Sequence, residues 1–164
     1  MTERENTGCR KIQPGIAPRP PGRHGLVQYM VDNVKGLKES EAYEITFFGD
    51  HTEFLESDYL ACCALGEYIL SMVDGVVDDP VGLEDIKPVL DVAFDILEQL
   101  SASDDDWIIA AVTSGAFDEI AICENDETFA AILHRLGPKS RELYDDWTHR
   151  MFPREPGAVP GVVL

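Results

Sequence analysis

Basic side chains are scarce in the middle of this chain. The 164 residues include 13 Lys and Arg against 31 Asp and Glu, which gives a formal net charge of -18. Between residues 39 and 134 the sequence has 24 acidic residues and a single basic one, Lys87. Because proteins gain affinity for nucleic acids through Lys and Arg contacts to phosphate, this balance argues against direct nucleic-acid binding. An anionic membrane surface would be repelled for the same reason.

Long apolar runs are also missing. The longest weakly charged run, residues 59–73, has 15 residues and contains Glu67, whereas a membrane-spanning helix needs about 20 apolar residues. The first ten residues lack the apolar stretch of a secretory signal. The four cysteines include the adjacent pair Cys62 and Cys63, which we expect to be reduced, structural thiols. These features predict a cytoplasmic protein.

The sequence also lacks the common catalytic motifs. The sequence has no phosphate-binding glycine loop, no GxGxxG and no GxSxG. His51 and Glu53 form an HxE pair, but the PCxxC motif that accompanies it in zinc deaminases is missing. Asp146 and His149, three residues apart, fit an exposed helical contact better than half of a metal site. We therefore expect no enzyme activity, no catalytic residue, no metal ligand and no cofactor.

Composition divides the chain into three parts. Residues 1–25 are basic and proline-rich, which predicts a disordered or extended arm, with folding back onto the acidic body as the alternative. Residues 26–152 form the expected acidic helical domain. Residues 153–164 contain several prolines and glycines and are expected to be a flexible tail.

Apolar residues in the central part recur at helical spacing. The sequence therefore predicts an all-α fold, a compact bundle of five or six helices, with stacked antiparallel helix pairs as a variant. Residues 43–48 are expected to be irregular. Asp50 and Asp126 are the expected N-caps of two helices, and a kink is expected at Ser114 and Gly115. The expected helices span residues 26–38, 50–73, 83–100, 107–123, 127–136 and 138–151.

The expected helix at residues 83–100 indicates how the acidity is arranged. Its apolar residues form an inward stripe, made by Ile86, Leu90, Ala93, Leu97 and Leu100. Its acidic residues fall on a stripe that we expect to face outward, made by Glu84, Asp91, Asp95 and Glu98. Pro88 fits this helix only in the first turn, where its missing N–H costs no hydrogen bond.

Three consecutive aspartates, Asp104, Asp105 and Asp106, precede the apolar run that starts at Trp107. Carboxylates in this position can cap a helix, because they meet unpaired backbone amides. They can also contact a partner, and the two roles are compatible. The candidate partner-binding residues are Asp91, Asp95, Glu98, Asp104, Asp105, Asp106 and Trp107.

Three segments carry a resemblance to a known group of proteins: residues 94–100 (FDILEQL), 115–119 (GAFDE) and 136–142 (LGPKSRE). Together they resemble uncharacterised bacterial all-helical domains of the type found among immunity proteins of polymorphic-toxin systems. The resemblance implies a bacterial, cytoplasmic, non-catalytic protein that neutralises a toxin. It transfers no functional residue, and Gly137 and Pro138 fit a helix boundary without any function.

The charge distribution leads to one main hypothesis. A strongly acidic surface attracts cationic partners and speeds their encounter, so we expect a non-catalytic protein that masks a basic surface or active site of a protein partner, such as a toxin. One alternative is a metal-dependent enzyme, or a metal-binding bundle, built from scattered Asp, Glu and His. Another is a small acidic adaptor without a single dedicated partner.

Overall fold

The computed structural model describes residues 17–47 and 57–153, and its regular elements in these ranges are all helical. The all-α prediction is confirmed. The described residues form seven helices rather than five or six, since α5, η2 and α6 are one continuous run. The elements are α1 (Leu26–Asn33), α2 (Glu41–Phe47), α3 (Asp58–Asp74), α4 (Pro80–Ser101), α5 (Asp106–Ala111), the π-helix η2 (Val112–Phe117), α6 (Asp118–Ala121), α7 (Asp126–Arg135) and α8 (Pro138–Met151).

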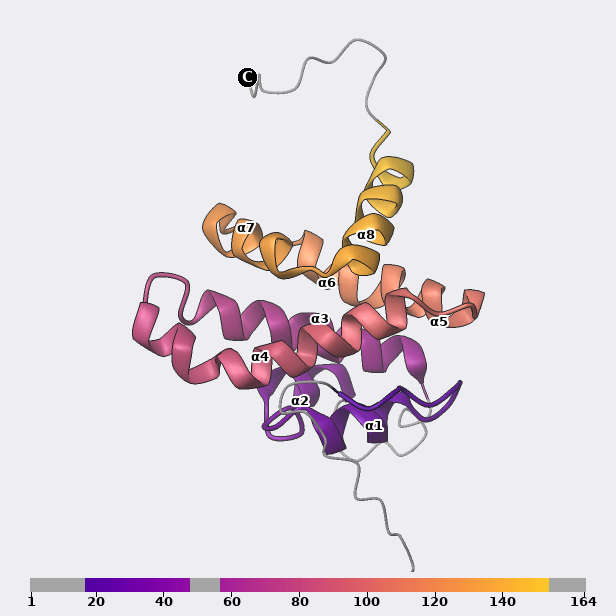
Figure 1. Ribbon diagram of the computed structural model, residues 1–164, viewed down its shortest axis with the longest axis horizontal. Helices are drawn as coiled ribbons and strands as arrows, with labels where there is room; N and C mark the ends of the chain where they lie inside the picture. The colour runs from indigo at the N-terminus through magenta and orange to yellow at the C-terminus, as the bar shows by residue number, and fades with distance from the viewer. Residues whose placement is uncertain (1–16, 48–56, 154–164) are drawn as a thin grey trace, which may run out of the picture.

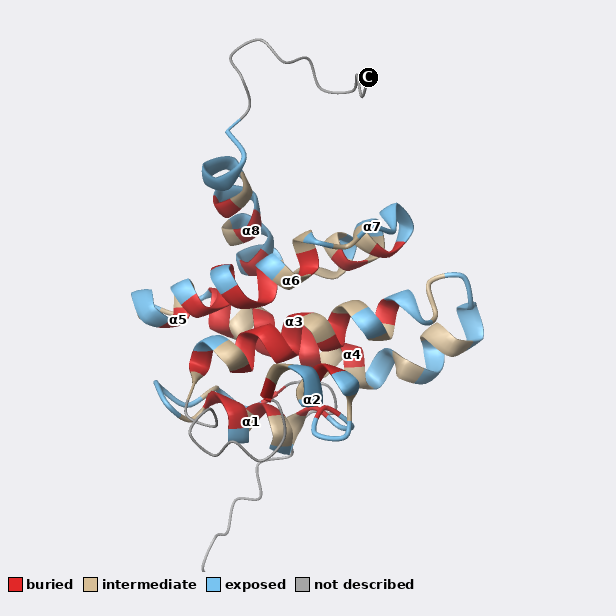
Figure 2. Cartoon of the chain, turned by 180° about the vertical axis from the view of Figure 1, so that it is seen from behind, coloured by how far each residue is buried: buried red, intermediate tan, exposed pale blue. Residues whose placement is uncertain are grey.

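Helix α3 occupies the middle of the molecule because it is apolar on most of its surface. Buried residues run along most of its length, as Figure 2 shows. It contacts α1, α2, α4, α5, η2, α6 and α7. In Figure 1, α1 and α2 lie on one side of α3 and α4, whereas α7 and α8 lie on the other. Burial of apolar surface against this one helix holds these elements in place, and α8 packs against α4 and η2 instead.

The π-helix η2 crosses α3 at very short range. A Cβ atom on Gly66 of α3 would lie 2.6 Å from the carbonyl oxygen of Ala116, and one on Gly115 would lie 2.9 Å from Cβ of Cys62. The two helices therefore approach so closely that only glycine fits at both positions. The predicted kink at Ser114 and Gly115 takes the form of this π-helical turn.

Residues expected to be irregular form the short helix α2. Ser40 starts it, since its side-chain oxygen accepts a hydrogen bond from the N–H of Tyr43 at 3.1 Å. Ala42 and Phe47 are buried, and α2 packs against α3. The irregular assignment was wrong because α2 is stabilised by packing against α3, the next helix along the chain, which the pattern of residues 43–48 alone does not indicate.

Helix α4 begins earlier than expected. Asp79 caps it by accepting from the N–H of Val81 at 3.1 Å, and Pro80 occupies the first turn. Pro88 therefore lies inside the helix, and its placement in the first turn was wrong. Pro88 is exposed, so water can satisfy the carbonyl group that loses its helical partner.

Two other helix starts also differ from the sequence prediction. Helix α3 starts at Asp58 behind the cap Ser57, whose side chain accepts from the N–H of Leu60; the expected cap Asp50 lies outside the described residues. Helix α7 is capped by Asn125, not by Asp126. The side-chain oxygen of Asn125 accepts from two backbone amides, which makes it the better cap.

The close approach of α3 and η2 generates a prediction. Gly66→Ala should lower the free energy of unfolding by about 1–3 kcal/mol, because the added methyl group meets backbone atoms that cannot turn away. Urea unfolding measures the change. The matched control is Gly75→Ala at the end of α3, where φ is -67° and the nearest atom to a Cβ is 3.4 Å away. Equal stability of the two variants would contradict this packing.

Candidate functional site

The candidate site lies where α4 turns into α5. We call Asp104, Asp105, Asp106 and Trp107 the acidic corner. Asp104 and Asp106 are exposed, and the Trp107 side chain is 52% exposed although it is large and apolar. Exposed aromatic groups beside charges are common anchors of protein interfaces. The acidic corner is thus the place where the predicted carboxylates and the predicted aromatic group are both accessible.

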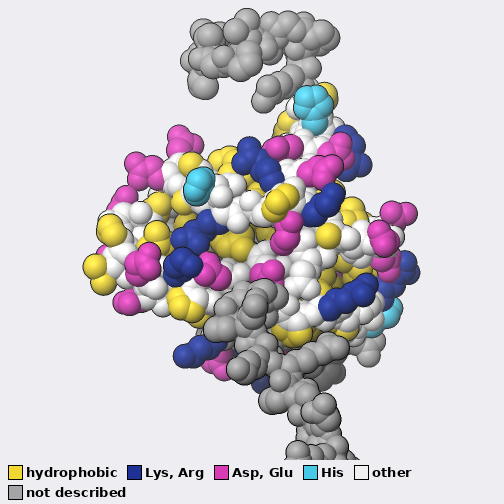
Figure 3. Space-filling model, in the orientation of Figure 1, with side chains coloured by type: hydrophobic (Ala, Val, Ile, Leu, Met, Phe, Trp, Pro, Cys, Tyr) yellow, Lys and Arg dark blue, Asp and Glu magenta, His cyan; other side chains and the backbone are white. Residues whose placement is uncertain are grey.

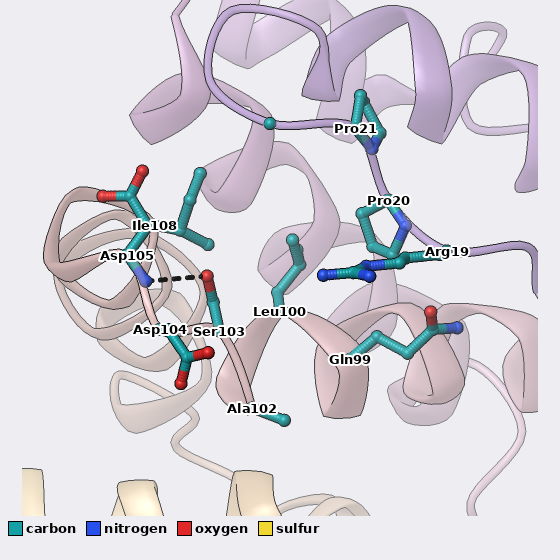
Figure 4. A pocket seen from close by; sticks show the side chains of 11 residues that line it. Arg19, Pro20, Pro21, Gln99, Leu100, Ala102, Ser103, Asp104, Asp105 and Ile108 are labelled. Atoms are coloured by element: carbon teal, nitrogen blue, oxygen red, sulfur yellow. Dashed lines mark hydrogen bonds between the residues drawn. The ribbon is translucent and has the colours of Figure 1, made fainter.

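A hollow of about 560 Å³ adjoins the acidic corner. Its lining comes from the end of α4, from the α4–α5 loop and from the N-terminal segment, residues 17–25. Figure 4 shows Arg19 and Pro20 of that segment facing Gln99 and Leu100, with Asp104 and Asp105 at the opposite end. The N-terminal segment therefore runs along one edge of the hollow.

Asp105 binds a guanidinium group from the N-terminal segment. Its carboxylate accepts from Nε and Nη2 of Arg23 at 2.8 and 2.7 Å, and it caps α5 by accepting from the N–H of Trp107 at 2.9 Å. The hydrogen bond from Arg23 is the main reason that the pKa of Asp105 falls to about 2. The predicted capping role of this aspartate is confirmed, and its second role is to bind a cation.

Trp107 completes the binding of Arg23. The guanidinium carbon of Arg23 lies 5.7 Å from the ring centroid of Trp107, within range of a cation–π interaction. The indole N–H of Trp107 donates to Asp58 at 3.2 Å, which fixes the orientation of the ring. The acidic corner thus presents a carboxylate and an aromatic face to one guanidinium group.

Asp58 is a site residue that the sequence analysis missed. Its carboxylate is 2% exposed and accepts from the backbone N–H of His24 at 3.0 and 3.1 Å, as well as from Trp107. A buried carboxylate needs such donors, because its desolvation is costly. It resembles an ordinary first-turn acid in the sequence, so no local signal marks it.

Two of the predicted binding acids on α4 have partners within the chain. Asp91 pairs with Lys87 at 2.6 Å and with Arg135 at 3.7 Å. Asp95 accepts from the N–H of Ala17 at 2.7 Å and from the side chain of Gln99 at 2.9 Å. Both acids are half-buried, so only part of the acidic stripe that was expected to face outward is open to solvent. Their contact with a partner stays a prediction.

Glu98, the third predicted acid on α4, caps a helix from a distance. It accepts from the N–H groups of Lys139 and Ser140 at 2.8 Å each and from the Ser140 hydroxyl at 2.7 Å. Gly137, at the start of α8, provides no side-chain cap of its own. Partial burial alone would raise the pKa of Glu98, but the three hydrogen bonds outweigh it and lower the pKa. Glu98 therefore joins α8 to α4.

The N-terminal segment lies against the acidic body. Ala17 is buried, its carbonyl oxygen accepts from Gln99, and the Tyr29 hydroxyl donates to the carbonyl of Pro18. These contacts agree with the fold-back alternative for residues 17–25. The division of the chain into arm, domain and tail stays a prediction, and residues 1–16 and 154–164 lie outside the described ranges.

Some of the surface carboxylates are paired with cations. Acidic and basic side chains are interleaved on the face seen in Figure 3. Arg141 pairs with Asp145 at 3.0 Å and Arg150 with Asp146 at 2.9 Å along α8. Asp146 thus contacts an arginine four residues on, in place of the expected contact with His149. Such pairs reduce self-repulsion and leave less negative charge on this face than the composition indicates.

A second group of acids lies where α3 meets α6. Burial raises the pKa of Glu67, and proximity to Glu41 adds to the effect. Burial also raises the pKa of Glu119, to which Glu67 and Asp118 contribute by like-charge repulsion. These acids lie close together and accept no hydrogen bond from the part of the chain that the structure describes, so their charges oppose folding at neutral pH.

The described residues offer little for nucleophilic or metal chemistry. Cys62 is fully buried, and burial raises the pKa of its thiol, so that little thiolate forms. Within residues 17–47 and 57–153, no three His, Cys, Asp or Glu side chains are grouped so that they could hold a metal ion. No helix in the same ranges is long and apolar enough to cross a membrane.

The remote cap of α8 generates a prediction. Glu98→Ala should lower the free energy of unfolding by about 1–2 kcal/mol at neutral pH, because it leaves the first amides of α8 without an acceptor. The pKa of Glu98 is lowered in the folded state, so this stabilisation is present above the unfolded-state pKa of about 4.3 and is lost as the pH falls further. Thermal unfolding between pH 3 and pH 7 measures it. Glu142→Ala, which removes an exposed acid of α8, is the control and should have little effect at any pH.

Comparisons of the chain with protein-family models, with curated proteins and with solved structures gave no match. The resemblance to immunity proteins of polymorphic-toxin systems therefore stays a prediction.

Proposed function

We propose that this chain is a non-catalytic cytoplasmic protein that binds a cationic protein partner and masks its basic surface or active site. One observation carries the proposal: the acidic corner binds a guanidinium group between the carboxylate of Asp105 and the ring of Trp107. Asp104 and Asp106 flank it as exposed carboxylates. The corner thus has a geometry suited to arginine and negative charge that steers arginine towards it.

The geometry favours arginine over lysine in the partner. Asp105 accepts two hydrogen bonds from one planar group, and a lysine ammonium group cannot match this fork. Trp107 adds a flat surface against which a guanidinium group stacks. The partner's binding element is therefore an exposed arginine, and the surrounding acids set rate and specificity.

A toxin acting on nucleic acid or another polyanion is the partner class that we favour. The active site of such an enzyme must be basic to hold its substrate, and a protein with an acidic corner can cover it. The resemblance of residues 94–100, 115–119 and 136–142 to bacterial immunity proteins points the same way. The raised pKa of the buried Cys62 thiol supports a binding role over a nucleophilic one.

Charge reversal at the acidic corner tests the proposal. Asp104→Lys with Asp106→Lys should slow association with a deca-arginine peptide about tenfold at low salt, because both exposed carboxylates that steer the cation are replaced. Stopped-flow measurement of Trp fluorescence gives the rate at two salt concentrations. The rate of the native protein should fall steeply as salt is added, and that of the variant should change less.

The control reverses the same number of charges elsewhere on the surface. Glu84→Lys with Asp85→Lys changes two exposed acids near the other end of α4 and should slow association much less. If the association rate falls equally in both double variants, the net charge of the chain governs binding and the acidic corner has no special role.

A further inference from the structure

We infer that the N-terminal segment, residues 17–25, is a built-in competitor that occupies the acidic corner through Arg23, so that a cationic partner binds only after Arg23 is displaced. The inference rests on the proposed function and adds its regulation. It also specifies the partner's binding element as an extended, arginine-bearing chain, since that is what now lies in the site.

The chemistry of the segment matches the chemistry that the site selects. Arg23 supplies the guanidinium group held by Asp105 and Trp107. Pro20 and Pro21 line one edge of the hollow, together with Leu100 and Ile108, so an extended proline-containing chain packs beside the acidic corner. The site therefore already has an occupant, which comes from the same chain.

The segment is anchored at both ends by hydrogen bonds to acids. At one end the N–H of Ala17 donates to Asp95, and the Ala17 carbonyl accepts from Gln99. At the other end the N–H of His24 donates to the buried Asp58. His24 has φ of 69°, a left-handed conformation that is strained for a residue with a side chain. The segment thus turns sharply at His24 before α1 begins.

The ion pair between Arg23 and Asp105 lies between these two anchors and is suited to release. The Arg23 and Asp105 side chains are 52% and 32% exposed, and an exposed ion pair contributes little to stability and weakens with salt. Pro18, Arg19, Pro21 and Gly22 are exposed as well. An arginine from a partner can therefore replace Arg23 in the same two contacts, while the firm anchor at Asp58 stays in place.

If Arg23 must first leave the site, the apparent affinity of the protein for an external cation equals the intrinsic affinity multiplied by the fraction of molecules in which the site is open. Weakening the segment must therefore strengthen binding of an external ligand. The probe is a fluorescein-labelled peptide that copies residues 17–25, and fluorescence anisotropy measures its binding to the full chain. Arg23→Ala should bind the probe about fivefold more tightly than the native protein, as expected if the segment is closed in about four-fifths of the molecules.

Two further variants distinguish release of the acidic corner from a general effect of charge. Lys87→Ala also removes one positive charge from an exposed ion pair, but at a distance from the acidic corner, and should bind the probe like the native protein. Arg23→Ala combined with Asp105→Asn should lose most of the gain, because the carboxylate that holds the guanidinium group is gone.

Equal binding by the native protein and Arg23→Ala overturns the inference but leaves the proposed function intact, since the corner would then bind cations without competition. An equal gain in Lys87→Ala also overturns it, because charge alone would explain the effect. Absence of binding to every variant overturns it too. Failure of the proposed function is judged separately, from the deca-arginine rates of the charge-reversal variants.

Discussion

The buried carboxylate of Asp58 is the interaction on which the candidate site depends. It accepts from the backbone of His24 in the N-terminal segment and from the indole of Trp107 at the start of α5. One side chain of α3 therefore fixes two elements that are far apart in the sequence. Because a buried charge without donors is very unfavourable, these three parts must come together. Their meeting places the ring of Trp107 beneath Arg23.

Hydrogen bonds from distant segments also stabilise two acids of α4. Glu98 holds the first amides of α8, and Asp95 holds the backbone of Ala17. These carboxylates stabilise the fold through donors from other segments, which relieves part of the repulsion that the net charge of -18 causes. The acidic corner differs, since Asp104 and Asp106 are exposed and Asp105 binds an arginine. The acidic residues thus have two roles. Those of α4 accept hydrogen bonds from other segments of the chain, and Asp105 at the acidic corner binds the guanidinium group of Arg23.

The sequence predicted what depends on local patterns. Apolar residues at helical spacing predicted the all-α fold, and the run of three aspartates before Trp107 predicted a carboxylate cap for α5, which Asp105 provides, because both features rest on neighbouring residues. It did not predict α2, a short helix that depends on packing against α3 rather than on its own sequence pattern. It also missed Asp58, because nothing near this residue in the sequence identifies Trp107 and His24 as its donors. The contacts of Asp95 and Glu98 were missed for the same reason: their partners, Ala17 and Ser140, are 78 and 42 residues away.

The most direct test of this account locates cation binding on the molecule. The measurement is the change in backbone amide and indole chemical shifts when deca-arginine is added to the isotopically labelled protein. The account predicts that shifts concentrate in residues 17–25 and 102–108 and include the indole N–H of Trp107. Shifts that centre instead on the acids between α3 and α6, such as Glu67 and Glu119, or that spread evenly over the acidic residues, would contradict it.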